Sequence, residues 1–359
     1  MLSDLAFHLA AAGREVEVVT SRQRYDDPRA QLPAREIVRG VRVTRVRTSR
    51  FGRSFLPGRA IDYATFYVSA FFALLARRDA TVVAMTDPPL ISVIAALASK
   101  RLINWTQDLF PEVAQGLGVR APRLLQRVRD WSLRRARVNV ALSDAMAARI
   151  GGKAVVQHNW ADEALTPIAP EANPLRAEWQ LGDRFVVGYS GNLGRAHEFG
   201  TLLEAMRAVP EAQFLIIGGG AQLEAVRRET RDLGNVQFRP YQPRELLSQS
   251  LSAADAHVMS LQPQLEGLIV PSKFYGILAV ARPVVFIGAA DSDLAKLIVA
   301  HDCGIVVAQG DAQALAAGLR ALARDPARAK AMGERGRALY VARFAPQVAF
   351  AHWEALLDA

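Results

Sequence analysis

A lysine in the first turn of a predicted helix is the strongest candidate for chemistry in this sequence. The stretch runs from Glu266 through Pro271 and Lys273 to Pro283. Pro271 suits the first position of a helix, where its missing N–H costs nothing, and the apolar residues 272–281 predict the rest of it. Lys273 then places a cation where it opposes the helix dipole. Sequences break such local rules mainly at functional sites.

The chemistry that this stretch favours is the binding of a sugar attached to a phosphate. Free backbone N–H groups, the helix dipole and an ammonium group together can hold a multiply charged anion such as a diphosphate. Glu266 lies seven residues before Lys273, so its carboxylate can face the same pocket. A carboxylate repels a phosphate, but it accepts hydrogen bonds from sugar hydroxyls. The alternative is a solvated lysine on an exposed turn.

A glycine-rich turn is the second candidate for anion binding. Residues 185–194 predict a strand followed by the turn, and residues 198–208 predict a helix. Glycines let the backbone approach a phosphate, and a helix start supplies N–H donors. Arg195 and His197 would add side-chain donors at that helix start. Such a turn alone fits many nucleotide sites, and its combination with Lys273 makes the prediction specific.

One segment resembles the donor site of GT-B glycosyltransferases: Glu266-Gly-Leu-Ile-Val-Pro-Ser-Lys-Phe-Tyr-Gly-Ile-Leu-Ala, with Arg-Pro downstream. It is similar to the large retaining family 4, in its exopolysaccharide and O-antigen branch of the colanic-acid type. The wider family has a Glu-x7-Glu pattern here, whose second Glu holds the ribose hydroxyls. This chain keeps the first acid, has Lys273 near the place of the second, and has Ala281 where a glycine is usual. The Gly-Asn-Leu-Gly form of residues 191–194 also resembles that branch.

The resemblance implies an α/β protein with the GT-B fold, in which two Rossmann-like, doubly wound domains face each other across a cleft. We expect an acceptor-side domain over residues 1–165, a nucleotide-sugar-binding domain over residues 166–345, and a helix over residues 346–359 that crosses back to the first domain. A doubly wound domain opens with a strand and a glycine-rich turn. Because residues 2–12 predict a helix and residues 15–20 a strand, we expect both opening elements to be missing here.

The resemblance also implies roles for individual residues on the donor side. Glu266 would hold the sugar hydroxyls, while Arg195 and Lys273 would stabilise the departing diphosphate. Backbone near Arg239 and Tyr241 would hold the nucleobase. The remaining expected donor contacts are Gly191, Asn192, Gly194, His197, Gly267 and Ser272.

Two aspartates are the candidates for contact with the acceptor. Asp87 and Asp108 follow predicted buried strands over residues 81–85 and 102–105. Ligands of open α/β sheets bind beyond the carboxyl ends of the strands. The run Gln-Asp-Leu-Phe-Pro-Glu around Asp108 also resembles the acceptor-side loop of the family. The alternative for both residues is a role in a turn or as a helix N-cap.

The sequence predicts neither a metal nor another cofactor beside the donor substrate. Asp291 and Asp293 imitate the Asp-x-Asp metal motif of single-domain (GT-A) transferases, but we expect them to cap a helix over residues 294–300. The sequence shows no other cluster of metal-ligand residues. Charge on the leaving group would then be neutralised by the basic side chains and helix starts of the donor site.

A formal net charge of +9 and a pI near 10.1 indicate an anionic partner. The sequence lacks the common motifs of nucleic-acid-binding proteins, which favours anionic lipid over nucleic acid. Residues 35–59 hold eight arginines and one acid, and residues 120–137 form a second basic segment. The alternatives are a solvated basic surface for the first and a helix that covers the sheet for the second. The apolar run over residues 64–76 is shorter than the about 20 residues that span a bilayer, and we expect burial rather than an interfacial position.

Together these patterns predict a retaining glycosyltransferase that moves a sugar from a nucleoside-diphosphate sugar to a lipid-linked or saccharide acceptor in surface polysaccharide synthesis. The start of the sequence does not have the pattern of a signal peptide, and a single cysteine, Cys303, excludes an intrachain disulfide. We therefore expect a cytoplasmic protein that is peripheral on the inner face of the cytoplasmic membrane. The alternatives are a nucleotide-sugar 2-epimerase and a catalytically impaired form that only binds the nucleotide sugar.

Overall fold

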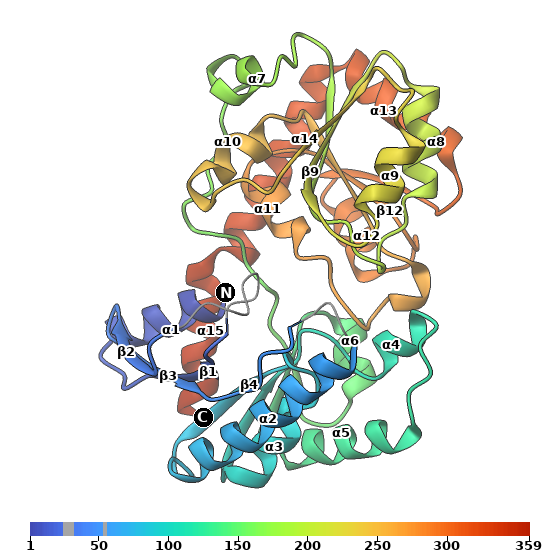
Figure 1. Cartoon of the computed structure of the whole chain (residues 1–359). Coiled ribbons are helices and arrows are strands. Elements are labelled where there is room, and N and C mark those ends of the chain that lie inside the picture. The colour runs from blue at the N-terminus through green and yellow to red at the C-terminus, as the bar shows by residue number, and fades with distance from the viewer. Residues whose placement is uncertain (24–31, 53–55) are drawn as a thin grey trace. The chain divides into compact units, whose positions relative to one another are not determined.

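The computed structural model describes residues 1–23, 32–52 and 56–359. Arg53, which belongs to the first predicted basic segment, lies outside the described residues. Within the part of the chain that is described, no helix is both long and apolar enough to cross a membrane. The chain forms two compact α/β units (Figure 1): residues 1–157 with 350–359, and residues 158–349.

The second unit is built on one six-stranded parallel sheet in the order β10-β9-β8-β11-β12-β13. This is the doubly wound order, in which the direction of the connections reverses between β8 and β11. Its strands are apolar on both faces because helices cover both. The strands are β8 (Val186–Asn192), β9 (Gln213–Gly219), β10 (Val236–Arg239), β11 (Ala256–Ser260), β12 (Val284–Ile287) and β13 (Gly304–Val307).

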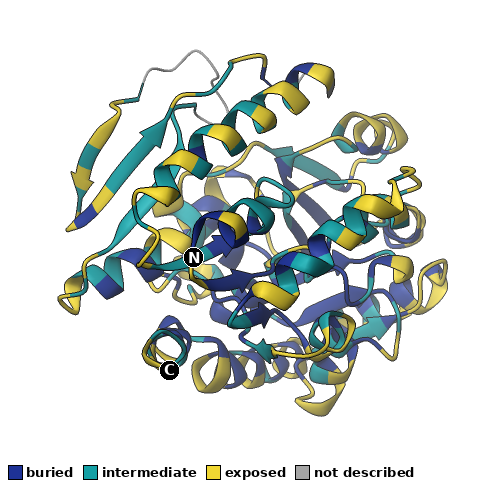
Figure 2. Cartoon of the chain, turned by 90° about the horizontal axis from the view of Figure 1, so that it is seen from below, coloured by how far each residue is buried: buried dark blue, intermediate teal, exposed yellow. Residues whose placement is uncertain are grey.

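The core of the second unit lies between this sheet and its helices, where Tyr189, Phe214 and Phe286 are fully buried. Figure 2 shows by colour that the central strands are mostly buried, that other strands are only partly buried, and that the outer faces of helices are exposed. The helices are α7 (Pro174–Glu178), α8 (Gly200–Ala208), α9 (Leu223–Glu229), α10 (Leu247–Ser252), α11 (Lys273–Ala279), α12 (Asp293–Ala300), α13 (Ala312–Arg324) and α14 (Pro326–Leu339). Short 3-10 turns lie at Pro170–Ala172, Arg244–Leu246 and Pro263–Leu265, and a π-helical turn lies at Tyr340–Phe344.

The first unit contains two separate sheets. In one, β1 (Glu17–Ser21) pairs in parallel with β3 (Val41–Val46), which pairs in antiparallel fashion with β2 (Arg35–Val38). The other is a parallel sheet of β4 (Thr81–Met85), β5 (Arg101–Trp105), β6 (Val138–Ala141) and β7 (Ala154–Val156), in that order. Among the described residues, no strand pairs with the second edge of β1 or with the outer edge of β4.

Helices pack on both sheets of the first unit. They are α1 (Leu2–Ala11), α2 (Leu56–Leu75), α3 (Ile91–Ala98), α4 (Glu112–Gly116), α5 (Arg123–Arg135), α6 (Asp144–Ile150) and α15 (Pro346–Asp358), of which residues from 350 onward belong to this unit. Trp353 of α15 and Trp105 of β5 are fully buried, with ring centroids 4.7 Å apart. This contact fixes the last helix to the four-stranded sheet that contains β5.

The apolar run over residues 64–76 lies in α2, and the expectation of burial is wrong for one face of that helix. Ala70 is buried, whereas Val68 is 60% exposed and Phe72 is 65% exposed. In the second basic segment, Trp131 of α5 packs against the core cluster that contains Leu102. α5 therefore covers the sheet, which was one of the two alternatives for this segment.

Candidate functional site

Lys273 reaches from the start of α11 to the carboxyl end of β8. Its Nζ lies 2.6 Å from the hydroxyl of Tyr189, 3.2 Å from the carbonyl oxygen of Asn192 and 3.1 Å from Nε2 of His197. None of these partners is a carboxylate. Burial lowers the pKa of Lys273 to about 7, because removal from water disfavours the charged form. A bound anion would stabilise the ammonium form of this side chain.

Gly191 makes room for the lysine side chain. A Cβ on residue 191 would lie 2.9 Å from Cε of Lys273, closer than real Cβ atoms come. The φ angle of Gly191 is also +122°, a conformation that L residues rarely adopt. We expected this glycine to let the backbone approach a phosphate. In the structure, Gly191 also leaves the space that the Lys273 side chain occupies at the end of β8.

His197 faces Lys273 as a neutral hydrogen-bond acceptor. Its Nδ1 lies 2.6 Å from the carbonyl oxygen of Ser260, which can only accept, so Nδ1 carries the proton and Nε2 a lone pair. Burial, and then the charge of Lys273, lower the pKa of His197 to about 4. This tautomer corrects the prediction that His197 donates to a diphosphate. Its Nε2 accepts from the lysine and holds the ammonium in place.

The start of α8 does not offer the anion site that the sequence predicted. α8 begins at Gly200 rather than at residue 198. Oε1 of Glu198 accepts a hydrogen bond from the backbone N–H of Thr201 at 2.9 Å. A carboxylate at the helix start would repel a diphosphate there. Arg195 and its neighbours therefore lie on the loop between β8 and α8, and not at a helix end.

Arg195 is the free cation of this loop. The residue is exposed, and its guanidinium has no hydrogen-bond or ion-pair partner among the described residues. Its carbonyl oxygen accepts a hydrogen bond from the side chain of Gln262 at 2.9 Å, which ties the loop to the segment after β11. The backbone is thus held while the guanidinium stays available for paired hydrogen bonds to an anion.

The turn around Gly194 is packed against the neighbouring strand end. Asn192 is exposed, and its side chain lies within 2.9 Å of the place that a Cβ on residue 194 would take. It also lies within 2.3 Å of where a Cβ on Gly220 would be. Glycines at these positions allow the ends of β8 and β9 to come close together. Gly191 and Asn192 therefore lie beside Lys273, and Gly194 packs against the side chain of Asn192.

Glu266 is anchored at the start of α12. Its Oε1 lies 3.3 Å from the backbone N of Asp293, the first residue of that helix. Gly267 has a φ of +70°, which favours glycine and turns the chain away after the acid. Ser272 is exposed directly before α11, and its hydroxyl makes no capping hydrogen bond to that helix.

α11 is shorter than the predicted helix over residues 272–281 because it ends in a left-handed residue. Ala281 has a φ of 53°, and its N–H donates to the carbonyl oxygen of Leu278 at 3.0 Å. The N–H of Arg282 donates to Ile277 at 3.2 Å, which completes a Schellman motif. Residues with a Cβ are strained in this conformation. This is a physical reason for the glycine that the family usually has here.

Tyr241 lies beside the glycine-rich end of β9. It is 59% exposed, and its hydroxyl donates to the carbonyl oxygen of Gly219 at 3.3 Å. The guanidinium of Arg239 instead lies 5.6 Å from the ring centre of Trp179 and donates to Gln237. The Arg239 side chain is thus engaged within the protein, and only its backbone remains for the predicted contact with a nucleobase.

Asp87 and Asp108 follow neighbouring strands of the first unit, β4 and β5. The hydroxyl of Thr86 accepts hydrogen bonds from the backbone N–H groups of Gln107 and Asp108, at 2.9 and 3.2 Å. Burial of its carboxyl group, and then the charge of Asp87, raise the pKa of Asp108 to about 6, although the residue keeps an exposed surface. The two carboxylates therefore act on each other at the carboxyl edge of this sheet.

The N-cap alternative does not hold for either aspartate. The residue before α3 is Leu90, and the residue before α4 is Pro111. On the other unit, Ser292 is the N-cap of α12, and its hydroxyl accepts from the N–H of Ala295 at 3.1 Å. Asp291 and Asp293 flank that cap. Within the described residues, no group of three or more His, Cys, Asp or Glu side chains could hold a metal ion.

Sequence reasoning missed Tyr189 as a partner of Lys273. Its ring lies under the ammonium, with Nζ 4.1 Å from the ring centre, and its hydroxyl donates to the carbonyl oxygen of Asn192 at 2.9 Å. The signal was a hydroxyl at the end of an otherwise apolar strand, directly before the glycine-rich turn. A buried Tyr normally finds a partner for that hydroxyl.

Two family models match this chain. Residues 173–339 match "Glycosyl transferases group 1", and residues 1–161 match "Glycosyl transferase 4-like domain". The chain therefore belongs to the group 1 glycosyltransferases, with a glycosyl transferase 4-like domain ahead of the group 1 domain. It is a glycosyltransferase, as the sequence predicted.

Known proteins agree with this assignment. The chain is 26% identical over 294 residues to "Putative colanic acid biosynthesis glycosyl transferase WcaI" of Escherichia coli (strain K12), which covers 73% of this chain and 71% of that protein. Sucrose-phosphate synthase from Thermosynechococcus elongatus has the same fold, with a TM-score of 0.79 at 20% identity over 99% of this chain and 92% of that one. Anabaena Alr3699/HepE in complex with UDP-glucose gives a TM-score of 0.69 at 17% identity over 88% and 86%. The predicted GT-B fold is confirmed.

Proposed function

We propose that this glycosyltransferase transfers a sugar from a nucleoside-diphosphate sugar to a lipid-linked or saccharide acceptor in surface polysaccharide synthesis, with retention of the anomeric configuration. The observation that carries the proposal is the Lys273 cluster at the carboxyl end of β8. Three neutral groups surround its amine, and none of them neutralises it. A diphosphate would supply the missing negative charge.

The donor diphosphate would bind between Lys273 and Arg195. Lys273 is the held cation, and Arg195 on the loop after β8 is the free one. As the bond to the sugar breaks, negative charge grows on the diphosphate, and preorganised cations stabilise that charge without rearrangement. We include independence of a metal ion in the proposal because the site offers cations, and not carboxylates, to the leaving group.

Glu266 would receive the sugar hydroxyls of the donor. One oxygen is fixed by the N–H at the start of α12, which orients the carboxylate. The nucleobase of the donor would lie against Tyr241 and the backbone after β10. Tyr241 is exposed there next to Gly219. Support for a nucleotide-sugar donor comes from HepE, whose solved complex contains UDP-glucose. Support for a polysaccharide pathway comes from WcaI, which is described as a colanic acid biosynthesis enzyme.

The acceptor would bind at Asp87 and Asp108 of the first unit. Carboxylates accept hydrogen bonds from sugar hydroxyls, and these two follow adjacent strands at the edge where ligands of α/β sheets bind. Asp108 is ionised only above about pH 6. Below that pH the carboxyl group is protonated, and it would no longer accept a hydroxyl hydrogen bond as a carboxylate.

A membrane surface would be the place of action, with α2 lying against the anionic inner face. Val68 and Phe72 share one exposed face of α2 with Ile61, which is 46% exposed, and Leu75, which is 39% exposed. Arg47 is exposed. It lies next to α2, since its carbonyl oxygen accepts a hydrogen bond from the hydroxyl of Ser69 at 2.8 Å. Apolar side chains bordered by basic ones suit an interface with anionic lipid.

The reaction is tested by incubating the protein with a panel of nucleotide sugars and lipid-linked saccharide acceptors. Mass spectrometry should detect a glycosylated acceptor, and NMR of the new linkage should show the anomeric configuration of the donor. Inverted configuration would contradict retention. Conversion of the donor to its 2-epimer without an acceptor would contradict glycosyl transfer as the main activity.

Membrane binding is tested by sedimentation with vesicles. The protein should sediment with vesicles that contain phosphatidylglycerol and remain in solution with phosphatidylcholine alone. The double variant Val68→Ser with Phe72→Ser should lose this binding, while Ile37→Ser, which changes a 77% exposed residue of β2, should keep it. Equal loss in both variants, or no binding by the unchanged protein, would remove the membrane from the proposal.

A further inference from the structure

The loop after β8 makes a tight turn over residues 194–197, beside the cation of the proposed donor site. The N–H of the last residue of the turn donates to the carbonyl oxygen of the first at 3.1 Å, which closes the turn. Arg195 and Ala196 are its central residues. Nζ of Lys273 lies 3.1 Å from Nε2 of His197, the last residue. The backbone of this turn is therefore within the surroundings of the lysine.

Gln222, the residue before α9, holds both ends of this turn. Its side-chain amide donates to the carbonyl oxygen of Gly194 at 2.6 Å and to that of His197 at 3.1 Å. Gln222 is itself fixed, because its backbone N–H donates to the carbonyl oxygen of Leu193 at 3.0 Å. Opening of the turn would break the bonds to both of its ends.

Gln262, on the segment after β11, holds the two central carbonyl groups. Its side-chain amide donates to the carbonyl oxygen of Arg195 at 2.9 Å, and its backbone N–H donates to that of Ala196 at 3.1 Å. The side-chain oxygen of Gln262 accepts a hydrogen bond from the amide of Gln264 at 2.5 Å. The Gln262 side chain is thus oriented with its NH2 group toward the turn.

These bonds leave the central N–H groups of the turn for another acceptor. Within the described part of the chain, the four carbonyl groups of the turn all accept hydrogen bonds, whereas the N–H groups of Arg195 and Ala196 donate none. In a planar trans peptide, the C=O and N–H groups point to opposite sides of the chain. Because the glutamines hold the carbonyl oxygens of residues 194 and 195, the two N–H groups that follow point away from the glutamine side chains.

We propose that Gln222 and Gln262 are positioning residues of the donor site. They hold the turn so that the N–H groups of Arg195 and Ala196 are available to the donor diphosphate. The inference rests on the proposed function, in which that diphosphate binds beside Lys273. Successive N–H groups, a guanidinium and an ammonium group suit an anion with several oxygen atoms. Since the glutamines fix these donors before the ligand arrives, binding requires little rearrangement.

Gln262 also connects this turn to the acid that is proposed for the donor sugar. The 3-10 turn Pro263–Leu265 follows it directly, and Glu266 is the next residue. The carbonyl oxygen of Gln262 accepts a hydrogen bond from the N–H of Leu265 at 2.9 Å. One short hydrogen-bonded segment therefore carries both the amide that holds the diphosphate turn and the carboxylate of Glu266.

The first test is hydrogen exchange of the unchanged protein, read at single amides by mass spectrometry. Since the amides of Arg195 and Ala196 donate to no group in the described residues, they should exchange rapidly without a ligand. The ligand is the tightest-binding of UDP, GDP, ADP, CDP and dTDP. At saturation it should slow both amides by about tenfold or more and leave exchange in β12 unchanged.

Two results of this experiment would contradict different claims. Binding of a nucleotide without protection of the two amides would refute the inference and leave the proposed function standing. No binding of any of the five nucleotides would overturn the proposed function and the inference with it.

The second test removes the side-chain amides one at a time. Gln222→Met and Gln262→Met keep the length of the side chain and lose its hydrogen-bond donor. Each should weaken nucleotide binding by about tenfold, because a turn that is no longer held presents its N–H groups less often. Each should also reduce the protection of the two amides at saturation. Gln313→Met, at an exposed position of α13, is the matched control and should bind like the unchanged protein.

Inorganic pyrophosphate separates positioning from a general loosening of the site. It should displace the nucleotide from the unchanged protein, and Gln222→Met and Gln262→Met should weaken both ligands by the same factor, because the turn would contact only the diphosphate. A larger loss for the nucleotide than for pyrophosphate, or unchanged affinity in both variants, would contradict the role of the glutamines. Thermal unfolding checks that the variants fold, and the exchange experiment on the unchanged protein is decisive if one does not.

Discussion

The carboxyl edges of the sheets in the two units carry opposite charges. At the end of β8 in the second unit lie Lys273 and Arg195, and at the ends of β4 and β5 in the first unit lie Asp87 and Asp108. Both edges occupy the position where ligands of α/β sheets bind. The cationic edge suits a diphosphate, whereas the anionic edge suits a hydroxyl-rich acceptor. Under the proposed function, one architectural plan would serve two kinds of ligand through a few side chains.

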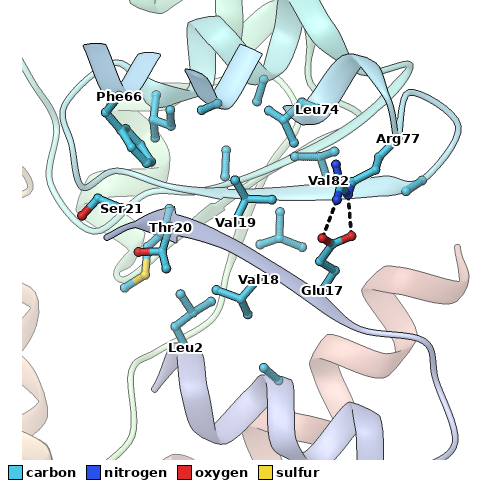
Figure 3. Close-up of a pocket in the computed structure, with 18 of the residues that line it drawn as sticks. Leu2, Glu17, Val18, Val19, Thr20, Ser21, Phe66, Leu74, Arg77 and Val82 are labelled. Atoms are coloured by element: carbon cyan, nitrogen blue, oxygen red, sulfur yellow. Dashed lines mark hydrogen bonds and ion pairs between the residues drawn. The ribbon is translucent and has the colours of Figure 1, made fainter. Parts of the chain in front are cut away.

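The two sheets also differ in continuity. The sheet of the second unit has six strands without a break, whereas the described strands of the first unit form two separate sheets, with a pocket between β1 and β4 (Figure 3). The donor-side residues therefore project from a complete sheet. On the proposed acceptor side, Asp87 follows β4, whose outer edge pairs with no strand among the described residues. This comparison predicts that donor binding and acceptor binding respond separately to substitutions.

The largest effect is expected from Lys273→Met. Loss of the buried cation should lower turnover by about a hundredfold or more, the size expected for a group that stabilises leaving-group charge. Folding lowers the pKa of this amine from its ordinary 10.5 to about 7, so the folded state loses stability as the pH falls from about 10.5 to 7, and the loss is nearly complete at pH 7. Tm at pH 7 should therefore be unchanged or higher. Turnover assays and thermal unfolding check both points.

The matched control for this substitution is Lys330→Met, at a highly exposed position of α14 whose ion pair within the described part of the chain is with Glu334. It should change neither turnover nor Tm appreciably. Equal turnover in the Lys273→Met and Lys330→Met proteins would remove Lys273 from the mechanism.

A smaller loss is expected from Arg195→Gln. The guanidinium is exposed, so its attraction for a diphosphate is partly screened. Affinity for a nucleoside diphosphate should fall about tenfold at low salt, consistent with loss of a charge-assisted hydrogen bond, and by less at high salt. Titration calorimetry at two salt concentrations measures this. Arg231→Gln, at another exposed arginine, should have no effect, and identical behaviour of the two variants would contradict the assignment.

Asp108→Asn should affect the acceptor side alone. With a pKa of about 6, the carboxylate is charged above that pH, so turnover should decline as the pH falls through 6. The variant should lose this acid limb and turn over about tenfold more slowly at pH 7.5, with unchanged affinity for a nucleoside diphosphate. Because folding raises this pKa, the substitution should not lower Tm at pH 7.5. An acid limb that persists in the variant would assign it to another group.

The smallest effect is expected from Ala281→Gly at the end of α11. Glycine adopts a φ of 53° without strain, so stability should increase by about 0.5–1 kcal/mol, or about 2 °C in Tm. Ala279→Gly, at the last residue of the same helix, should lower Tm because a fully buried methyl group is lost. A lower Tm for both variants would show that the left-handed residue is not strained.

Sequence reasoning predicted the α/β fold of both units, because strand composition is a local signal. It also named Gly191 and Asn192, which the structure places beside Lys273, because the glycine-rich turn is a local signal too. It did not reach the contacts of Lys273. Its partners Tyr189 and His197 lie 84 and 76 positions away, and only tertiary packing brings them together.

Two other errors have physical reasons of the same kind. The helix start at residue 198 was wrong because Glu198 uses its side chain to cap Thr201, which delays α8 to Gly200. Burial of residues 64–76 was half wrong because apolar composition does not say which face of a helix is covered. In both cases the local pattern correctly predicted a helix. The contacts of that helix with the rest of the protein set where it begins and which face is buried.

The central claim, that Lys273 binds the donor diphosphate, is tested most directly by counting protons. Calorimetric titration with UDP and with GDP at pH 8, in HEPES and in Tris, gives the number of protons taken up when the tighter-binding nucleotide binds. With a pKa of about 7, the amine is mostly neutral at pH 8, and the diphosphate should bring it to the ammonium form. Uptake of most of one proton by the unchanged protein, and of none by Lys273→Met, is the expected result. Binding without proton uptake, or equal uptake by both proteins, would contradict the account.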